Sequence, residues 1–357
     1  MRVSTRLGWG ILVACAVLVP LFIRNPYVLH VLVLSLVYAI LATSLNLITG
    51  YSGLLSLGHQ AFFGIGAYTS ALLVVDLGVP FPLAMLAGGV ASTAAAYFIG
   101  GITLRLRSAY FVISTIAFAE MLRLVSLNWY SLTRGPMGIA NIPPPSVGPF
   151  LFNTHVRTYY FILVLASLAI VVSQRIVNSH IGHVLMGIRD AEHVAKAVGV
   201  YPTKYLLISV LVGGFMAGVA GSFYAHYMRF LSPDVFFFSI SVNLIVMVVG
   251  GGIGTVVGPV IGAFVFTAAP EVLRFSQQYR LIIYGTVLIL VVRFLPGGLW
   301  TLVEAAGRRL RGCTGLARQR TTERPVKILS TRESEVELLE CPQGEGSEGS
   351  IWRSHSH

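Results

Sequence analysis

Long apolar runs alternate with short polar or charged stretches over most of this chain. Ten such runs can be outlined, and several are nearer 15 residues than the roughly 20 that a straight helix needs to cross about 30 Å of hydrocarbon. The pattern predicts an all-α transmembrane bundle of about nine or ten spans, some of them broken or re-entrant. The runs are Leu7–Ile23, Tyr27–Ile48, Leu54–Leu77, Phe81–Leu104, Tyr110–Trp129, Thr158–Val172, Tyr205–Tyr227, Val235–Val249, Ile253–Ala269 and Leu281–Leu295.

The first run resembles a signal peptide in one respect, because Arg2 and Arg6 precede it. No small-residue cleavage site follows it, and Arg24, Asn25 and Pro26 end it instead. We therefore expect a retained first membrane helix and a tight hairpin to the second.

The composition supports a membrane protein. Hydrophobic residues make up 55% of the 357 residues and charged residues 11%, with a mean hydropathy of +0.78. These values exclude a water-soluble globule of this length. The net charge of +11 indicates no nucleic-acid partner, because the cations gather beside apolar runs and set orientation. The three cysteines show no disulfide or metal-binding spacing, and we expect no cofactor.

The cations of the loops are distributed unequally between the two faces of the membrane. One face carries Arg2, Arg6, Arg105, Arg107, Arg175, Arg189, Lys196, Lys204, Arg308, Arg309 and Arg311. The other carries Arg24, Arg134, Arg157, Arg229, Arg274 and Arg280. The positive-inside rule makes the first face cytoplasmic, and an even number of spans places both termini there.

The apolar pattern ends at about Trp300. We expect residues 1–299 to form the transmembrane domain, with a cytoplasmic loop at 176–204, and residues 300–357 to form a disordered cytoplasmic tail rich in Gly, Ser and Glu. The basic start of this tail can lie against anionic lipid headgroups.

A glycine-rich polar stretch from Ser44 to Tyr68 interrupts a region that otherwise belongs in the membrane. Irregular backbone at that depth must be buried in protein or line a cavity, and broken helices offer free amides and carbonyls to a polar solute. Alternatively, the glycines only let helices approach and His59 bonds to a neighbouring carbonyl. The candidate pathway residues of this stretch are Asn46, Ser56, Gly58, His59, Gln60 and Gly66.

The loop after Arg175 contains a second informative pattern. Small or apolar residues recur at helical spacing at Val184, Leu185, Ile188, Ala191 and Ala195. The pattern predicts a short amphipathic helix over 181–198 that ends at Gly199. Its few cations and small apolar face make lipid binding weak, which favours docking to a protein partner.

Both stretches resemble the permease subunits of branched-chain amino acid ABC importers. The first matches S-L-N-L-x-x-G-Y-x-G-x-x-S-L-G-H-x-A-F-F-G-I-G-A-Y from Ser44 to Tyr68, and the second covers Ser179 to Gly199. Further similar segments are 119–123, 217–221, 232–233 and 251–259. The resemblance spans about Tyr27 to Leu299.

The resemblance implies a heteromeric importer in a bacterial inner membrane. Its other parts would be a second related permease, two cytoplasmic ATPase subunits and a periplasmic solute-binding protein. We expect the helix to dock into an ATPase, with Val184 and Ile188 as apolar anchors and Arg189 as the polar contact. The residues assigned to this coupling are Gly182, Val184, Ile188, Arg189, Asp190, Ala195 and Gly199.

The chain departs from the family pattern at several positions. His183 stands where Arg is usual, Gly187 where Ala is usual, and Arg134-Gly135-Pro136 where a Gly-Gly pair is common. The last departure is expected on the periplasmic side and leaves the substrate or the binding-protein partner open. A branch of the same family that carries urea also resembles this chain, so urea is an alternative substrate.

Two polar residues inside later spans are further pathway candidates. Glu120 lies within an apolar run, where a carboxylate needs a partner, and Arg123 can pair with it on the same helix face. Asn243-Leu244-Ile245 weakly echoes Asn46-Leu47-Ile48, as an internally duplicated, inverted-repeat transporter would show.

The chain lacks the G-x-x-x-x-G-K-[ST] phosphate cradle, so it does not hydrolyse ATP itself. Energy must come from another chain or from a gradient. A secondary transporter is the main alternative class and a passive channel the next. An intramembrane enzyme is the least expected, because the spans show no H-E-x-x-H, paired aspartates or Ser-His arrangement.

Overall fold

A computed structural model describes residues 25–272 apart from 107, 149 and 153, together with residues 20, 285, 298, 299 and 301. The chain divides into two compact units, Met1–Leu310 and Arg311–His357, and only the first contains described residues. The expected spans Leu7–Ile23 and Leu281–Leu295 lie outside the described residues except for Pro20 and Gly285. Almost all of the expected tail lies outside them too, so its disorder stays a prediction.

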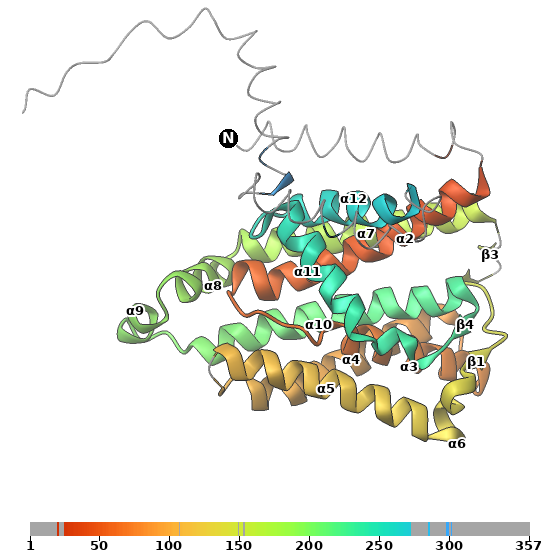
Figure 1. Cartoon of the computed structure of the whole chain (residues 1–357), viewed down its shortest axis with the longest axis horizontal. Coiled ribbons are helices and arrows are strands. Elements are labelled where there is room, and N and C mark those ends of the chain that lie inside the picture. The colour runs from red at the N-terminus through yellow and green to blue at the C-terminus, as the bar shows by residue number, and fades with distance from the viewer. Residues whose placement is uncertain are drawn as a thin grey trace, which may run out of the picture. The chain divides into compact units, whose positions relative to one another are not determined.

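The described residues form a helical bundle with very short strands (Figure 1). The helices are α2 Pro26–Asn46, the π-helix η1 Leu47–Tyr51, α3 His59–Val75, α4 Phe81–Thr103, α5 Ser108–Asn128, α6 Tyr130–Thr133, η2 Gly135–Met137, α7 His155–Val177, α8 His180–Asp190, α9 Glu192–Ala197, α10 Pro202–Met228, η3 Pro233–Phe236, α11 Phe238–Gly252 and α12 Gly258–Val272. The strands are β1 Ile139–Ala140, β2 Ser146–Val147, β3 Phe150–Leu151 and β4 Phe230–Leu231. The predicted all-α class is confirmed.

Five of the described helical segments are long and apolar enough to cross a membrane: α2 continued by η1, and α4, α5, α7 and α10. They coincide with five of the expected spans, although α7 extends beyond the expected Thr158–Val172 at both ends. Two further apolar helices, α3 and α11, are shorter. The helix α3 begins at His59 and not at Leu54, because the backbone from Gly53 to Gly58 is not helical.

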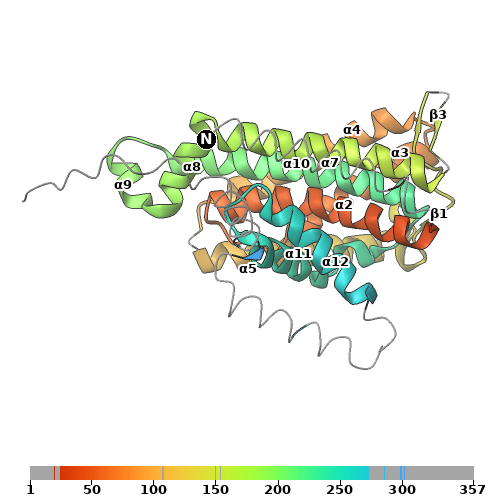
Figure 2. The same cartoon turned by 90° about the horizontal axis from the view of Figure 1, so that it is seen from above.

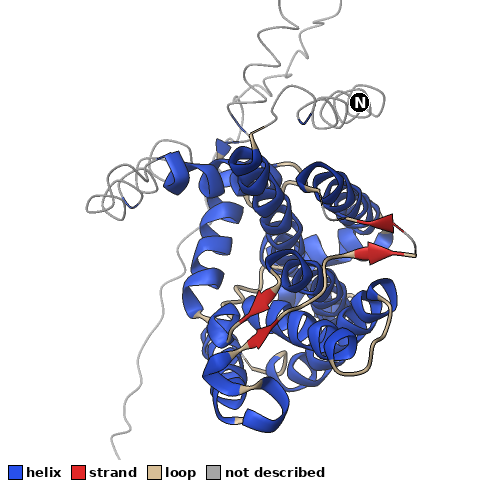
Figure 3. Cartoon of the chain, turned by 90° about the vertical axis from the view of Figure 1, so that its right-hand side faces the viewer, coloured by secondary structure: helices blue, strands red, loops and turns tan. Residues whose placement is uncertain are grey.

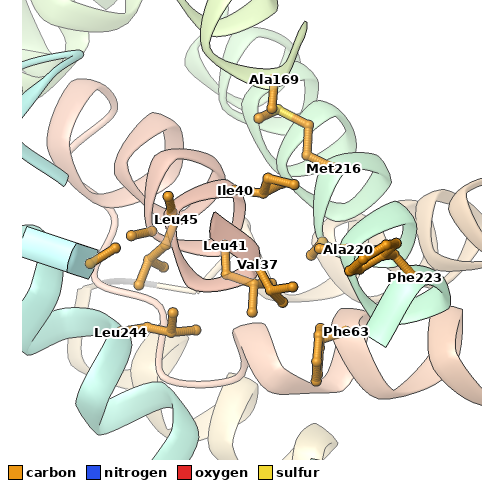
Figure 4. Packing of buried hydrophobic residues seen from close by; sticks show 14 of the residues in the cluster. Val37, Ile40, Leu41, Leu45, Phe63, Ala169, Met216, Ala220, Phe223 and Leu244 are labelled. Carbon is orange, nitrogen blue, oxygen red and sulfur yellow. The ribbon is translucent and has the colours of Figure 1, made fainter. Parts of the chain in front are cut away.

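The helices pack through small residues. The helix α10 lies against α3 and α4 over long contacts. A Cβ added at Gly66 on α3 would meet the backbone of Gly218 on α10, and one added at Gly218 would meet Ser92 on α4. Since lipid supplies no hydrophobic drive between helices, close packing of this kind holds membrane bundles together. Larger apolar side chains from α2, α3, α7, α10 and α11 fill the core around this contact (Figure 4).

The two ends of the bundle carry different structures. The helices α8 and α9 lie at one end, and the strands lie at the opposite end (Figures 1 and 2). There β1 pairs antiparallel with β4, with Ile139 opposite Leu231, and β2 pairs with β3 (Figure 3). The first pair ties the loop after α5 to the end of α10, so the connections at this end are held by hydrogen bonds.

The predicted single helix over 181–198 is two helices, and this prediction was wrong. Helix α8 ends at Asp190, and Ala191 adopts a non-helical conformation with φ −155° and ψ 79° before α9 begins. The apolar residues of α8 face α10, whereas α9 buries none of its residues. The bend therefore takes α9 out of line with α8, and on α9 Ala195, partly buried, still packs against the cluster of Leu185, Ile188 and Leu206. The predicted end at Gly199 is confirmed: Gly199 has φ +83°, and the Val200 amide donates to the Ala195 carbonyl in a Schellman-type cap.

Candidate functional site

The first feature of the site is the interruption between α2 and α3. The last turn of α2 widens into the π-helix Leu47–Tyr51, and the chain then runs without regular structure from Gly53 to Gly58. Gly53 has φ +74°. Single π-turns inside α-helices frequently occur at functional sites, and the broken helix predicted for this stretch is confirmed.

Asn46 joins this interruption to a second one between α11 and α12. Its Nδ2 donates to the Thr255 carbonyl at 2.7 Å, and its Oδ1 accepts from the Gly254 amide at 3.0 Å. Gly254 has φ +72°, which favours glycine. The side chain is 1% exposed. Asn46 thus uses both ends of its amide group to hold the two helix breaks together.

Arg189 reaches the same junction from α8. Its Nη1 donates to the Gly50 carbonyl at 2.7 Å, and its Nε donates to Asp190 at 3.0 Å. A Cβ added at Gly53 would lie 2.7 Å from the Arg189 Cγ, and one at Gly254 would lie 3.2 Å from its Nη1. The guanidinium of Arg189 is therefore engaged with the interrupted helices of its own chain, and its expected contact with an ATPase stays a prediction.

Three other predicted pathway residues are buried together in the bundle interior. His59 is 0% exposed, and its Nε2 lies 2.6 Å from the Ser44 hydroxyl. Gln60 accepts a hydrogen bond from Ser241 on α11, and Ser56 is buried. His59 therefore bonds a hydroxyl and not the carbonyl that the alternative interpretation required. Its Nδ1 has no partner among the residues that the structure describes.

Gly58 and Gly66 are positions of close backbone approach. A Cβ at Gly58 would collide with the Thr115 carbonyl on α5, and one at Gly66 with the Gly218 backbone. These contacts support the packing role that the sequence left open for the glycines.

Glu120 and Arg123 form the intrahelical pair that the sequence allowed. The Arg123 Nε donates to both carboxylate oxygens, at 2.8 and 3.0 Å, and the guanidinium lies 5.6 Å from the centroid of the Phe237 ring. Asn243 is exposed on α11, so the structure does not bring it to Asn46.

The coupling residues of α8 serve mainly to hold this helix to the bundle. Gly182 lets α8 approach the end of α7, where a Cβ would meet the Val177 carbonyl. Ile188 is 4% exposed and clusters with Leu185 and Leu206, while Val184 is half-buried against the same cluster. The Ile188 side chain therefore packs inside the chain in this arrangement, and its expected role as an anchor for a partner stays a prediction.

Exposed apolar residues that the sequence analysis missed lie on and after α9. Val194 is 64% exposed, Val198 76% and Tyr201 79%. Apolar residues on a segment that buries nothing point to an interaction surface. The sequence did contain a sign of this surface, because Val194 and Val198 are four positions apart and so share one side of a helix. The interpretation of 181–198 as one straight helix obscured it.

A cavity of about 250 Å³ lies at the strand end. His226 on its wall is held between the Ser70 hydroxyl at 3.0 Å and the Pro143 carbonyl at 2.8 Å. No group of three or more His, Cys, Asp or Glu side chains within the described ranges could hold a metal ion. The lining residues are Pro144, Pro145, Phe152, His155, Thr158, His226, Tyr227 and Arg229.

Several apolar helices long enough to cross a membrane, with helix breaks joined at two points and a helical pair at one end, define a polytopic membrane protein. The model of the family "Branched-chain amino acid transport system / permease component" matches residues 27–292, and the chain belongs to this family. It is 30% identical over 289 residues to the high-affinity branched-chain amino acid transport system permease protein LivM of Salmonella typhimurium and, equally, to that of Escherichia coli. Each match covers 74% of this chain and 68% of the relative. No solved structure matches.

Proposed function

We propose that this chain is the permease subunit of an ABC importer that moves branched-chain amino acids across a bacterial inner membrane. Separate ATPase subunits would supply the energy. The relatives named above support the substrate, because their names give branched-chain amino acid transport. The chain's own lack of a phosphate-binding cradle supports an external ATPase.

The observation that carries this proposal is the bond between Arg189 and the Gly50 carbonyl. A partner that moves α8 and α9 would move Arg189, and through it the backbone of the interruption between α2 and α3. Asn46 would pass the displacement to the loop between α11 and α12. A projecting helix that is hydrogen-bonded to one helix break, which Asn46 joins to the other, is what an ATP-driven permease requires. A passive channel does not require such a link between a projecting helix and the helix breaks.

The ATPase would bind the exposed surface of α9. We replace Ile188 as the proposed anchor with Val194, Val198 and Tyr201, which are the most exposed apolar side chains of this region. Val184, which is half-buried, remains a proposed contact at the edge of this interface. Asp190, whose side chain is 67% exposed, remains a proposed polar contact. A few side chains that become fully desolvated at the centre of an interface, with Tyr among the enriched types, carry most of the binding energy.

The remaining partners follow from this assignment. A second related permease would complete the membrane domain, two ATPases would sit on the α8–α9 end, and a periplasmic binding protein would dock at the strand end. Both termini would then lie in the cytoplasm, with membrane lipid around the spans.

Co-purification and reconstitution test the proposal. A tagged chain expressed with the subunits encoded beside it should retain two ATPases and a second permease. In proteoliposomes with the binding protein, leucine uptake should require ATP. Uptake driven by an ion gradient without ATPase would overturn the ATP-driven class. ATP-dependent uptake of urea in place of leucine would overturn the substrate and leave the class standing.

A further inference from the structure

The cavity at the strand end has a positively charged wall. Its volume is about 250 Å³. Three parts of the chain line it: the loop region around β2 and β3, the start of α7 and the end of α10. Arg229 lines it from the end of α10 and His155 from the start of α7, and no Asp or Glu is among its lining residues. A cavity with a guanidinium and no carboxylate favours an anionic ligand.

Hydrogen bonds hold the walls of this cavity in place. His226 joins α10 to Ser70 on α3 and to the loop after β1. The Tyr227 hydroxyl lies 2.7 Å from the Nδ1 of His30 on α2, and the Thr158 hydroxyl donates to the carbonyl of Phe152 at 2.9 Å. The cavity is therefore preformed, and a ligand would not have to order its walls on binding.

Arg229 has a backbone conformation that favours glycine. It directly follows α10 with φ +58°, and its amide donates to the Ala225 carbonyl. Glycine is the usual residue at a left-handed helix end, because a Cβ is unfavourable there. A cation near a helix C-terminus is favourable, but any position of the last turn would serve for that. Arginine is therefore present at a cost to the backbone, as is found at binding sites.

The cavity lies on the side of α7 that faces the bundle. His155 shares a face with Ile162, which is 0% exposed and lies about two turns further along the helix. Val164 and Leu168 are exposed and lie on the opposite side, roughly half a turn round from His155. Arg157, also exposed, shares that outer side. A lipid lying along the outer side of α7 would therefore meet Arg157 and not the cavity.

Exposed apolar side chains flank the cavity. Met228 is 40% exposed and Phe230 48%, and they stand on either side of Arg229 in the chain. Met137 is 82% exposed, and a Cβ added at its neighbour Gly138 would lie 3.2 Å from the Phe230 ring. Phe, Met and Arg are enriched in protein–protein interfaces. The cavity volume of about 250 Å³ is below the roughly 300–1,000 Å³ of small-molecule sites, which favours a single side chain of a docked protein.

We propose that this cavity binds the carboxylate of an aspartate or glutamate side chain that projects from the periplasmic solute-binding protein. The Arg229 guanidinium pairs with this carboxylate, and the His155 ring donates a second hydrogen bond. Met228 and Phe230 pack against the surface around the acidic residue. The inference rests on the proposed function, which places a binding protein at the strand end, and deepens it by naming the contact and its chemistry.

Docking of the purified solute-binding protein to the permease–ATPase complex in nanodiscs tests the site. Biolayer interferometry gives the Kd for wild type, Arg229→Gly, Arg229→Lys and His155→Gln. Arg229→Gly should weaken docking by about 10- to 100-fold, because the charge pair is lost. The unfolding temperature of this variant should stay at or above that of wild type, because glycine suits a φ of +58°. Arg229→Lys keeps the charge without the guanidinium geometry and should lose less than Arg229→Gly, and His155→Gln should also lose less.

Arg157→Gln is the matched control, because it removes the same charge from an exposed position that does not line the cavity. It should weaken docking by about fivefold at most. Equal losses in Arg157→Gln and Arg229→Gly would indicate a general electrostatic effect and overturn the proposal. Unchanged docking of Arg229→Gly, or weaker docking together with a lower unfolding temperature, would overturn it too. The loss should be the same in nanodiscs of phosphatidylcholine with or without phosphatidylglycerol, and a loss confined to phosphatidylglycerol would make a lipid headgroup the ligand.

A charge reversal identifies the partner group. Arg229→Glu should abolish docking of the wild-type binding protein. Each surface Asp and Glu of the binding protein is replaced by Lys in turn, and one replacement should bind Arg229→Glu more tightly than it binds wild type. If none does, the proposal is wrong. ATP-driven leucine uptake that depends on the binding protein is measured with wild type on the same samples. Its absence would reject the proposed function, whereas its presence together with unchanged docking of Arg229→Gly would reject the site alone.

Discussion

Arg189 and Gly50 lie 139 positions apart in the chain, yet the guanidinium of the first donates to the carbonyl of the second at 2.7 Å. The bond joins a helix outside the spans to the point where a span is interrupted. A carbonyl in a π-turn is free of its usual helical partner and can accept from a side chain. Movement of α8 therefore has a direct route to the irregular backbone.

Arg189→Ala should uncouple transport while leaving the complex assembled. The variant loses a charge-assisted bond worth about 1.5–3 kcal/mol, and we expect stimulation of ATP hydrolysis by loaded binding protein to fall about 10-fold or more. Basal hydrolysis should stay near wild type. Arg189→Lys, which can still donate to Gly50, should recover part of the stimulation. Asp190→Asn is the matched control, since it leaves the Gly50 bond intact, and full stimulation in Arg189→Ala would contradict the proposed link.

Asn46→Ala should destabilise the junction between the two interruptions. It leaves the Gly254 amide and the Thr255 carbonyl without their amide partner, and each unsatisfied buried group costs about 1–3 kcal/mol. The thermal unfolding temperature of the purified complex should drop, and uptake with it. Asn178→Ala changes an exposed asparagine at the end of α7 and should change neither quantity. Equal unfolding temperatures for the two variants would show that Asn46 does not stabilise the junction between the two helix breaks.

The sequence predicted the helical elements well because the apolar runs report burial in lipid and protein directly. The run Phe81–Leu104 became α4 with an end shifted by one residue. The bend at Ala191 was not predictable, because periodicity does not show that Ile188 packs against Leu206 on the following long helix while the chain leaves helical geometry at Ala191. Helical periodicity alone continues through such a point.

The candidate site was predicted as a set of residues but not as a set of roles. The stretch Ser44–Tyr68 contains the break between α2 and α3, and its glycines indicated that a helix is interrupted there. Whether Asn46 met solute or protein depended on Gly254 and Thr255, which lie over 200 positions away. The same holds for Arg189, whose partner is a backbone carbonyl that any residue could have supplied.

Substitution of Gly66 should act through packing between α3 and α10. A Cβ there meets the backbone of Gly218, which cannot move aside as a side chain can, so overpacking of about 1–3 kcal/mol is expected for Gly66→Ala and more for Gly66→Leu. Uptake and thermal stability should fall together. Gly101→Ala on α4 is the control, because nothing lies within 4 Å of the added Cβ and helix propensity improves. Loss of uptake in Gly66→Ala with unchanged stability would instead favour a direct role in the pathway.

Truncation of the exposed apolar residues just after α9 should weaken ATPase binding without harming the fold. Val198→Ala and Tyr201→Ala remove side chains that are 76% and 79% exposed, so their loss costs the isolated chain little. If they anchor a partner, truncation should cost about 2–4 kcal/mol, or roughly 30- to 1,000-fold in affinity. Retention of ATPase subunits on the tagged chain, followed through a salt and dilution series, measures this effect.

Ile188→Ala supplies the contrast for this experiment, because it truncates an apolar side chain that packs against Leu185 and Leu206 inside the chain. It should lower thermal stability by about 2–5 kcal/mol and affect ATPase retention only through that loss. If Ile188→Ala released the ATPase at unchanged stability while Val198→Ala and Tyr201→Ala retained it, the partner would bind α8 with Ile188 turned outward.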